Sequence, residues 1–337
     1  MAHLDPPVKA TRLAPPMTWW TRLSIFAAGY LTDATRRADG TINRRLLAYL
    51  DPGVPPSAAP RNGVASRNLD IDPSLPLPLR ARLFHPAPAS STQLPVVVFF
   101  HGGGFAYLSA SSPAYDAACR RIARHCGAAV LSVDYRRAPE HCFLAAYDHC
   151  IPKNTPGVAP AYDDAFAALR FLDDPKKLPT ARPLRSRCFL AGDSAGANIA
   201  HHVARRYALS ASSFASVRVH GLVAIQPFFG GQERTPAELR LDGAPIVSVP
   251  RCDWMWRAFL PPGADRTHEA AHAASPAAAA GIDSEAFPPA VVVVGGGKEV
   301  QLLEYTDAIH AFYVFPEFAE SKDLMLRIKD FVAAGSK

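Results

Sequence analysis

The sequence lacks any apolar run long enough to cross a membrane. A spanning helix needs about 20 consecutive apolar residues, whereas charged or polar residues interrupt the hydrophobic stretches of these 337 residues at much shorter intervals. The mean hydropathy of 0.00 also argues against a membrane protein. Residues 1–16 carry charges and several prolines instead of the apolar segment of a secretion signal. We therefore expect no membrane span and no secretion signal.

The chain also lacks paired CxxC cysteines and long basic runs. Scattered cysteines in a chain of this length are typical of reduced thiols in an intracellular protein, so we expect a cytoplasmic location, with the nucleus as an alternative. The net charge is +6, but the arginines are spread along the chain, which indicates a solvated basic surface and no nucleic-acid partner. The six cysteines are Cys119, Cys126, Cys142, Cys150, Cys188 and Cys252.

Buried strands alternate with amphipathic helices from residue 95 onward. Continuous apolar runs are typical of strands buried on both faces of a sheet, and segments with apolar residues at helical spacing separate them. This alternation predicts an α/β fold with a mainly parallel, doubly wound sheet. The expected strands are residues 95–100, 128–133, 188–191, 219–226, 289–294 and 300–305, and the expected helices are residues 113–126, 163–172, 196–208 and 321–335.

The first 60 residues form a separate N-terminal segment. Residues 18–31 and 42–50 each have the spacing of an amphipathic helix, and prolines after residue 51 end this pattern. We expect a helical arm or cap over residues 1–60 and a main domain over residues 61–337. That domain would begin with a hairpin of two strands, residues 64–71 and 79–84, at one edge of the sheet.

Two internal segments interrupt the alternation of strands and helices. Residues 141–160 contain prolines that cannot continue a helix, which indicates an inserted surface loop. Residues 228–289 are rich in proline, alanine and glycine and include one aromatic helix, residues 252–259. This segment would either form a cap over a functional site or pack as ordinary core, and the sequence leaves both possibilities open.

The stretch around Ser194 combines a strand, a Gly-x-Ser-x-Gly pattern and a helix. Gly192 and Gly196 flank Ser194 at positions where a sharp strand-to-helix turn leaves little room for side chains. Such a turn exposes the serine hydroxyl and directs free N–H groups of the helix at a developing anion. In this context the pattern predicts a nucleophilic serine, although the pattern alone would also fit a glycine-rich turn with a capping serine.

A second glycine cluster follows the expected strand at residues 95–100. His101 precedes three consecutive glycines, Gly102, Gly103 and Gly104. Three glycines cost backbone entropy, so their presence suggests a close approach of the backbone to another group. The loop resembles the His-Gly-Gly-Gly loop whose N–H groups form the oxyanion hole in one branch of the α/β-hydrolases.

With these motifs the chain resembles a plant carboxylesterase of the hormone-sensitive-lipase-like branch of the α/β-hydrolases, which also contains the gibberellin receptors. The resemblance covers most of the chain. It implies an α/β-hydrolase fold with a helical cap, hydrolysis of a small-molecule ester through an acyl-enzyme, and no metal or organic cofactor. Its carriers are residues 39–44 (Asp-Gly-Thr-Ile-Asn-Arg), 101–105 (His-Gly-Gly-Gly-Phe), 134–140 (Asp-Tyr-Arg-Arg-Ala-Pro-Glu), 192–196 (Gly-Asp-Ser-Ala-Gly) and 307–312 (Asp-Ala-Ile-His-Ala-Phe).

The resemblance also implies a role for individual residues. Ser194 would be the nucleophile, and His310 would be the general base that takes its proton and later returns one to the leaving group. Two other histidines, His201 and His202, follow Ser194 on the expected helix and should be packed or solvated instead of catalytic. The N–H groups of Gly103, Gly104 and Ala195 would bind the oxyanion, in a loop that Gly102 helps to shape.

The acid of the expected Ser-His-acid triad is missing. In the family this acid follows the strand that corresponds to residues 289–294, but here three glycines lead directly to Lys298 and Glu299. Because adjacent parallel strands need a crossover of about a dozen residues, we infer that the acid loop and its helix are deleted. Residues 300–305 would then be displaced or antiparallel. Glu299 and Asp307 are the nearest carboxylates, and we expect weakened activity and reduced stability.

Two functions therefore remain open. The first is a carboxylic-ester hydrolase that has been weakened by loss of the acid. The second is a catalytically inactive pseudoenzyme or a small-molecule binding protein similar to the gibberellin receptors. The receptors replace the base histidine, whereas this chain keeps His310, so the sequence favours the esterase. The oligomeric state and the natural substrate are not determined by these motifs.

Overall fold

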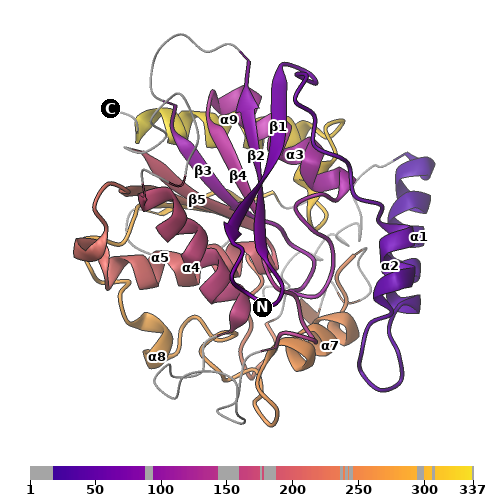
Figure 1. Cartoon of the computed structure of the whole chain (residues 1–337). Coiled ribbons are helices and arrows are strands. Elements are labelled where there is room, and N and C mark those ends of the chain that lie inside the picture. Colours follow the sequence, from indigo (N-terminus) through magenta and orange to yellow (C-terminus); the bar gives the residue numbers. More distant parts are fainter. Residues whose placement is uncertain are drawn as a thin grey trace, which may run out of the picture.

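A computed structural model describes residues 18–87, 94–142, 159–174, 177, 187–235, 238–239, 242, 246–293, 300–305 and 308–335. Within these residues an eight-stranded sheet forms the centre of the molecule, and helices cover both of its faces (Figure 1). The strand order is β1-β2-β4-β3-β5-β6-β7-β8. The predicted α/β fold with a mainly parallel sheet is confirmed.

The strands follow the apolar runs of the sequence. Strand β3 is buried at every position because its five side chains are all apolar and helices cover both faces of the sheet. β1 and β2 form the predicted antiparallel hairpin at one edge, β2 also pairs antiparallel with β4, and the neighbours from β4 to β8 are parallel. The bounds are β1 Val64–Asp72, β2 Leu79–Pro86, β3 Val96–Phe100, β4 Ala129–Asp134, β5 Cys188–Asp193, β6 Val219–Ile225, β7 Ala290–Val293 and β8 Val300–Leu302.

The helices are divided between the two faces of the sheet. α4, α5 and α7 contribute to the hydrophobic cluster on one face, and α3 and α9 contribute to the cluster on the other. α3 begins at Pro113 and ends before Gly127, whose φ of 58° is the left-handed conformation that glycine adopts easily. The bounds are α1 Trp19–Ala34, α2 Arg44–Leu50, α3 Pro113–Cys126, α4 Pro160–Asp173, α5 Ala195–Ala208, α7 Val249–Phe259, α8 Pro276–Ala279 and α9 Ala319–Ala334, with short 3₁₀ helices η1 Ala211–Ser213 and η2 Phe312–Val314.

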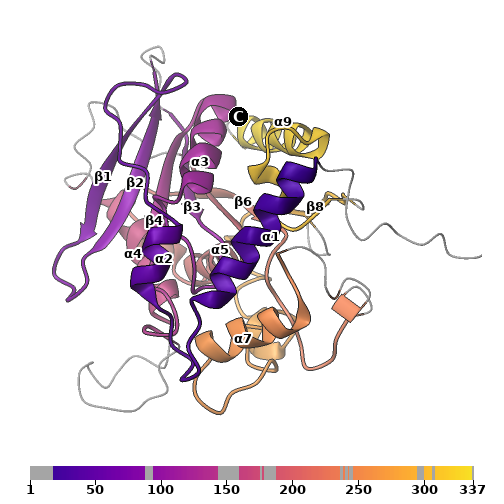
Figure 2. The ribbon, with the colours of Figure 1, turned by 90° about the vertical axis from the view of Figure 1, so that its right-hand side faces the viewer.

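The two N-terminal helices lie against the main body. Figure 2 shows α1 running across the molecule between α9 and α7. The Arg251 guanidinium of α7 donates to the Asp33 carboxylate of α1 at 2.6 Å. Arg44 of α2 pairs with Glu140 and also donates to the carbonyl oxygens of Ala106 and Ala138. The arm is therefore joined to the loops that follow β3 and β4.

The pairing of β8 corrects one prediction. β8 lies parallel to β7, with Val300 opposite Ala290, so the expected displacement or antiparallel pairing is wrong. The reason is the shortness of both strands. The end of β7 and the start of β8 are about 10 Å apart along the strand direction, and a chain of six residues, the number between the two strands, can reach roughly 20 Å. Such a return does not require a crossover helix.

The last helix starts earlier in the chain than the sequence predicts. It begins at Ala319, two residues before the predicted start at Ser321, and the Ser321 hydroxyl donates to the carbonyl oxygen of Tyr313. The cysteines that the structure describes carry free thiols. Across the described ranges, no helix is long and apolar enough to span a membrane. The described residues do not include most of the expected 141–160 insertion, nor Cys150, Glu299 and Asp307.

Candidate active site

Ser194 occupies a sharp turn between β5 and α5. Its φ of 51° and ψ of −120° lie outside the regions that non-glycine residues ordinarily adopt. A Cβ atom on Gly192 would overlap the backbone of Gly196, and a Cβ atom on Gly196 would overlap the carbonyl oxygen of Phe100. Strand and helix therefore approach as closely as the glycine spacing predicts, and no larger residue fits at either position.

The segment after β6 holds the backbone of Ser194. The Ser194 N–H donates to the carbonyl oxygen of Ile225 at 2.9 Å, and the N–H of Phe228 donates to the carbonyl oxygen of Ser194, also at 2.9 Å. Only 9% of Ser194 is exposed to solvent. These bonds fix the strained residue on both sides.

The glycine loop after β3 presents free N–H groups next to this turn. Gly103 and Gly104 have φ values of +103° and +58°, conformations that are strained for other residues. Among the residues that the structure describes, no acceptor receives the N–H groups of Gly103, Gly104 or Ala195. The loop and the start of α5 can therefore offer donors to a negatively charged oxygen.

Gly102 has a different role, because its N–H is already bound. It donates to the Asp193 carboxylate at 2.9 Å and approaches the Tyr115 hydroxyl at 2.7 Å. The Tyr115 hydroxyl in turn donates to Asp193 at 3.0 Å. Gly102 thus ties the glycine loop to Asp193, and its N–H is not available to a substrate.

Asp193 is a buried carboxylate that the sequence reasoning did not single out. Burial raises its pKa to about 6, although hydrogen bonds from Tyr115 and the Gly102 N–H oppose that shift. Its position between Gly192 and Ser194, inside the motif itself, is the sequence feature that could have identified it. The carboxylate couples the serine turn to the glycine loop through Gly102.

Helix α7 packs against the glycine loop at Gly104. The Met255 side chain occupies the space that a Cβ atom on Gly104 would need. Trp256 stacks on Phe228 with ring centroids 4.6 Å apart, and Phe259 stacks on Phe105 at 3.7 Å. Trp256 and Phe259 thus pack in the core, while Met255 faces the loop.

His310 lies in the loop before η2, and its imidazole is partly buried. Desolvation lowers the pKa of His310 to about 4. Its neighbours are bound by Gln226, whose side-chain oxygen accepts the Ala311 N–H at 2.7 Å and whose amide nitrogen donates to the Ile309 carbonyl at 3.2 Å. Within the described part of the chain, neither a carboxylate nor Ser194 is hydrogen-bonded to the His310 imidazole.

A cavity of about 440 Å³ lies between α1 and the main body. Its walls are mainly apolar. It reaches Gly103 on the glycine loop and Ala311 next to His310, with Met255 between the loop and α1. The cavity therefore adjoins the residues that the sequence predicts for the site.

Two other histidines and the charged loop after β4 have structural partners. His202 stacks on Tyr162 with ring centroids 4.5 Å apart, and burial lowers the pKa of both His201 and His202. These two histidines are packed. Arg136, in the charged loop after β4, forms an ion pair of 2.7 Å with Asp164. No group of three or more His, Cys, Asp or Glu side chains in the described ranges is placed to hold a metal ion.

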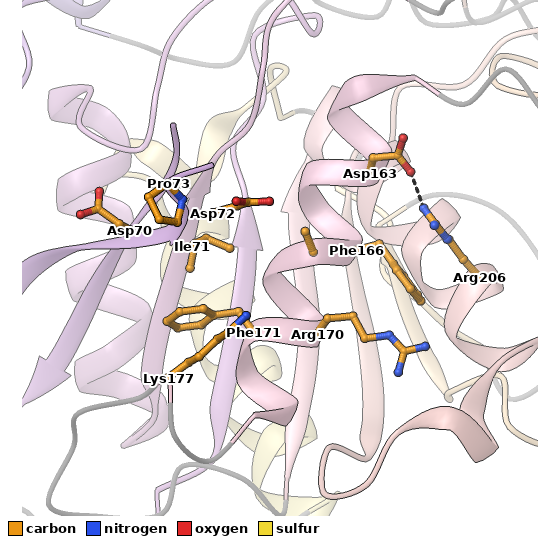
Figure 3. A pocket seen from close by; sticks show the side chains of 11 residues that line it. Asp70, Ile71, Asp72, Pro73, Asp163, Phe166, Arg170, Phe171, Lys177 and Arg206 are labelled. Carbon is orange, nitrogen blue, oxygen red and sulfur yellow. Dashed lines mark hydrogen bonds and ion pairs between the residues drawn. The ribbon is translucent and has the colours of Figure 1, made fainter. Parts of the chain in front are cut away.

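A second hollow, of about 740 Å³, lies beside α4 (Figure 3). Several of its charged groups have partners in the structure. Asp163 pairs with Arg206 at 2.6 Å, and Arg170 donates to Ser213. None of the predicted site residues lines this hollow, so it does not belong to the candidate active site.

Comparison with known proteins identifies the class of this chain. A sequence model of the α/β-hydrolase fold matches residues 97–153 and 158–298. The chain belongs to the α/β-hydrolase family. It is 38% identical over 350 residues to a gibberellin receptor of Arabidopsis thaliana, covering 95% of this chain and 94% of that receptor. It is 34% identical over 237 residues to Carboxylesterase 20 of the same plant, covering 68% of each.

Solved structures show the same fold. An α/β hydrolase enzyme from the metagenome of Lake Arreo superposes with a TM-score of 0.68 at 21% identity, covering 94% of this chain and 98% of that chain. An esterase of Pyrobaculum calidifontis gives a TM-score of 0.65 at 23% identity, covering 95% and 99%. At these identities the likeness concerns the fold.

Proposed function

We propose that the protein is a carboxylic-ester hydrolase with Ser194 as its nucleophile. The observation that carries the proposal is the strained Ser194 turn beside the N–H groups of Gly103, Gly104 and Ala195, which have no acceptor among the described residues. Preorganised donors of this kind stabilise the oxyanion of a tetrahedral intermediate. Carboxylesterase relatives and esterase-like folds support the same reaction class.

The proposed reaction has two stages. Ser194 Oγ attacks the ester carbonyl carbon as its proton passes to the His310 imidazole, and the carbonyl oxygen becomes an anion that the free N–H groups bind. Collapse breaks the ester bond, and His310 returns the proton to the leaving alcohol. Water then attacks the acyl carbon as His310 takes one of its protons. The acyl–Ser194 bond breaks, the acid is released, and His310 returns the proton to Ser194 Oγ.

Because no carboxylate among the described residues is hydrogen-bonded to His310, we expect a slow enzyme. The low pKa of about 4 keeps the imidazole neutral near pH 7 and able to accept a proton, but it also makes the imidazolium costly to form. Loss of the acid costs on the order of 10⁴ in rate in related triads while leaving residual catalysis. Glu299 and Asp307 are the two carboxylates proposed for testing as a substitute.

We further propose that residues 1–60 and 228–289 supply a cap. Arg251 of α7 binds Asp33 of α1, and both helices line the 440 Å³ cavity. That cavity would hold the acyl or alcohol part of a small-molecule ester, since its mainly apolar walls favour an apolar group. The protein would act on this substrate in the cytoplasm or nucleus.

The test is the initial rate on p-nitrophenyl acetate and butyrate. Ser194→Ala and His310→Ala should each abolish the protein's rate, while Ser212→Ala, an exposed serine, should leave it unchanged. Glu299→Gln and Asp307→Asn, measured separately, would identify a substitute acid by a loss of 10²-fold or more. An identical rate for the unaltered chain and Ser194→Ala, in protein with an intact circular dichroism spectrum, would exclude the hydrolase.

A second function is binding of a small molecule without turnover. Identity to gibberellin receptors extends over about 95% of this chain, and the cavity beneath α1 could enclose a ligand. Calorimetric titration with a gibberellin would distinguish this function. Binding by a chain that shows no Ser194-dependent hydrolysis would support the receptor-like protein, and absence of binding with hydrolysis present would support the enzyme.

A further inference from the structure

We propose that Gln226 is a positioning residue that holds the His310 loop in register with Ser194. The inference rests on the proposed ester hydrolysis. Gln226 follows directly after β6, at the carboxyl end of a parallel strand, and its side chain binds the backbone on both sides of His310. It receives the Ala311 N–H at 2.7 Å and donates to the Ile309 carbonyl oxygen at 3.2 Å.

The same segment also binds Ser194. Ile225 accepts the Ser194 N–H, and the Phe228 N–H donates to the Ser194 carbonyl oxygen, each at 2.9 Å. Gln226 lies between these two residues. Four hydrogen bonds therefore connect the nucleophile and the histidine loop through one short stretch of chain, so a displacement of this stretch would move both groups.

The backbone at this junction is strained at three positions. Ser194, Gln226 and Ala311 have positive φ values of 51°, 43° and 58°, which non-glycine residues rarely adopt. Strain of this kind persists only where surrounding contacts over-determine the conformation, and it gathers at functional sites. The Gln226 side chain supplies two such contacts to the histidine loop.

The chemistry of the junction requires an amide. One partner of Gln226 is a donor, the Ala311 N–H, and the other is an acceptor, the Ile309 carbonyl. A primary amide satisfies both at once, and the reversed amide would face donor with donor and acceptor with acceptor. A carboxylate keeps only the first bond. Methionine has nearly the same length and volume as glutamine and makes neither.

The substitutions to compare are Gln226→Met and Gln226→Glu, with Gln232→Leu as the matched control. Gln232 lies six residues further along the chain and is exposed. On p-nitrophenyl butyrate we expect Gln226→Met to lower kcat by 10- to 100-fold with KM within twofold, because substrate binding does not involve this side chain. Gln226→Glu, which keeps the bond to Ala311, should lose less at neutral pH.

The pH profile separates positioning from loss of fold. A carboxylate at position 226 would lie beside His310 and stabilise its charged form, so Gln226→Glu should move the acid limb of the kcat/KM profile to higher pH by at least half a unit. Gln226→Met should lower the plateau instead. A kcat for Gln226→Met within twofold of the unaltered enzyme, with unshifted profiles, would overturn the proposal.

Histidine NMR provides a readout that does not depend on activity. The His310 ring signals are the ones missing from the spectrum of His310→Gln. Loosening the loop should expose the imidazole to water, so Gln226→Met should raise the pH midpoint of these signals, and Gln232→Leu should not. If the chain hydrolyses no ester but this midpoint moves, the proposed function fails and the junction stands. If ester hydrolysis is present and neither kcat nor the midpoint changes, only the inference about Gln226 fails.

Discussion

The carbonyl oxygen of Phe100 lies where the first side-chain atom of any larger residue at Gly196 would have to sit. The contact is between the end of β3 and the first turn of α5, the helix that follows the Ser194 turn. The partner atom belongs to backbone in the middle of the sheet, so it cannot move aside as a flexible side chain would.

Gly196→Ala should therefore disrupt the fold around Ser194. We expect a loss of stability of about 3 kcal/mol or more, seen as a lower denaturation midpoint or as insoluble protein. Gly231→Ala is the matched control, because a Cβ atom at Gly231 meets nothing closer than 3.8 Å. Equal stability of the two variants would show that strand and helix are further apart than described.

Arg44 should stabilise the glycine loop from the arm. Its guanidinium donates to the carbonyl oxygen of Ala106 and pairs with Glu140. We expect Arg44→Gln to lower the melting temperature by a few degrees and to speed amide hydrogen exchange in residues 103–108, since the loop loses a bound carbonyl.

The neighbouring Arg45 provides the control for this experiment. It is exposed, and its side chain forms no ion pair or hydrogen bond with the residues that the structure describes. Arg45→Gln should leave both the melting temperature and the exchange rates unchanged. If the two substitutions have the same effect, the change in overall charge is responsible, and the contact with Ala106 is not.

Stability should fall as the solution is acidified below about pH 6.5. Burial lowers the pKa of His101 to about 3 and those of His201 and His310 to about 4, and it lowers the pKa of His202 well below 6.5. Between pH 6.5 and 4 the unfolded chain therefore binds protons that the folded chain does not bind. The free energy of unfolding decreases over this window. We expect about 1–3 kcal/mol per histidine.

Urea denaturation at pH 7.5, 6 and 4.5 would measure this effect. His202→Phe keeps a ring that can stack on Tyr162 but has no proton to bind, so its stability should fall less steeply than that of the unaltered chain. His85→Gln, at a partly exposed position of β2, serves as the control. Parallel pH curves for all three proteins would contradict the assignment to buried histidines.

Ionisation of Asp193 should change the stability with pH in the direction opposite to that of the buried histidines. Its folded pKa of about 6 lies above the ordinary value of 3.8, so its contribution to stability is complete below about pH 3.8 and is lost as the pH rises through 6. Asp193→Asn cannot ionise. The stability of this variant relative to the unaltered chain should therefore improve between pH 4 and 6 and stay constant above that. A difference that does not depend on pH would show that the carboxylate is not desolvated.

Features with local physical causes could be predicted from the amino-acid sequence. Apolar runs produced the buried strands, glycines marked the positions of Gly192 and Gly196 where backbones almost touch, and the edge hairpin followed from its turn residues. The α/β-hydrolase fold could be predicted for the same reason. Ser194 and His310 were also named from their motifs, and their catalytic roles remain predictions.

Contacts between segments that are distant in sequence became visible only in the folded chain. Gln226 binds the residues around His310 because the order of the strands brings the end of β6 next to that loop, and no local pattern records this contact. The hydrogen bond between Gly102 and Asp193 and the contact of Met255 with Gly104 are likewise not recorded in any local pattern. The parallel pairing of β8 was mispredicted because the rule for crossover length applies to strands of ordinary length, and these two strands are short enough to be joined by six residues.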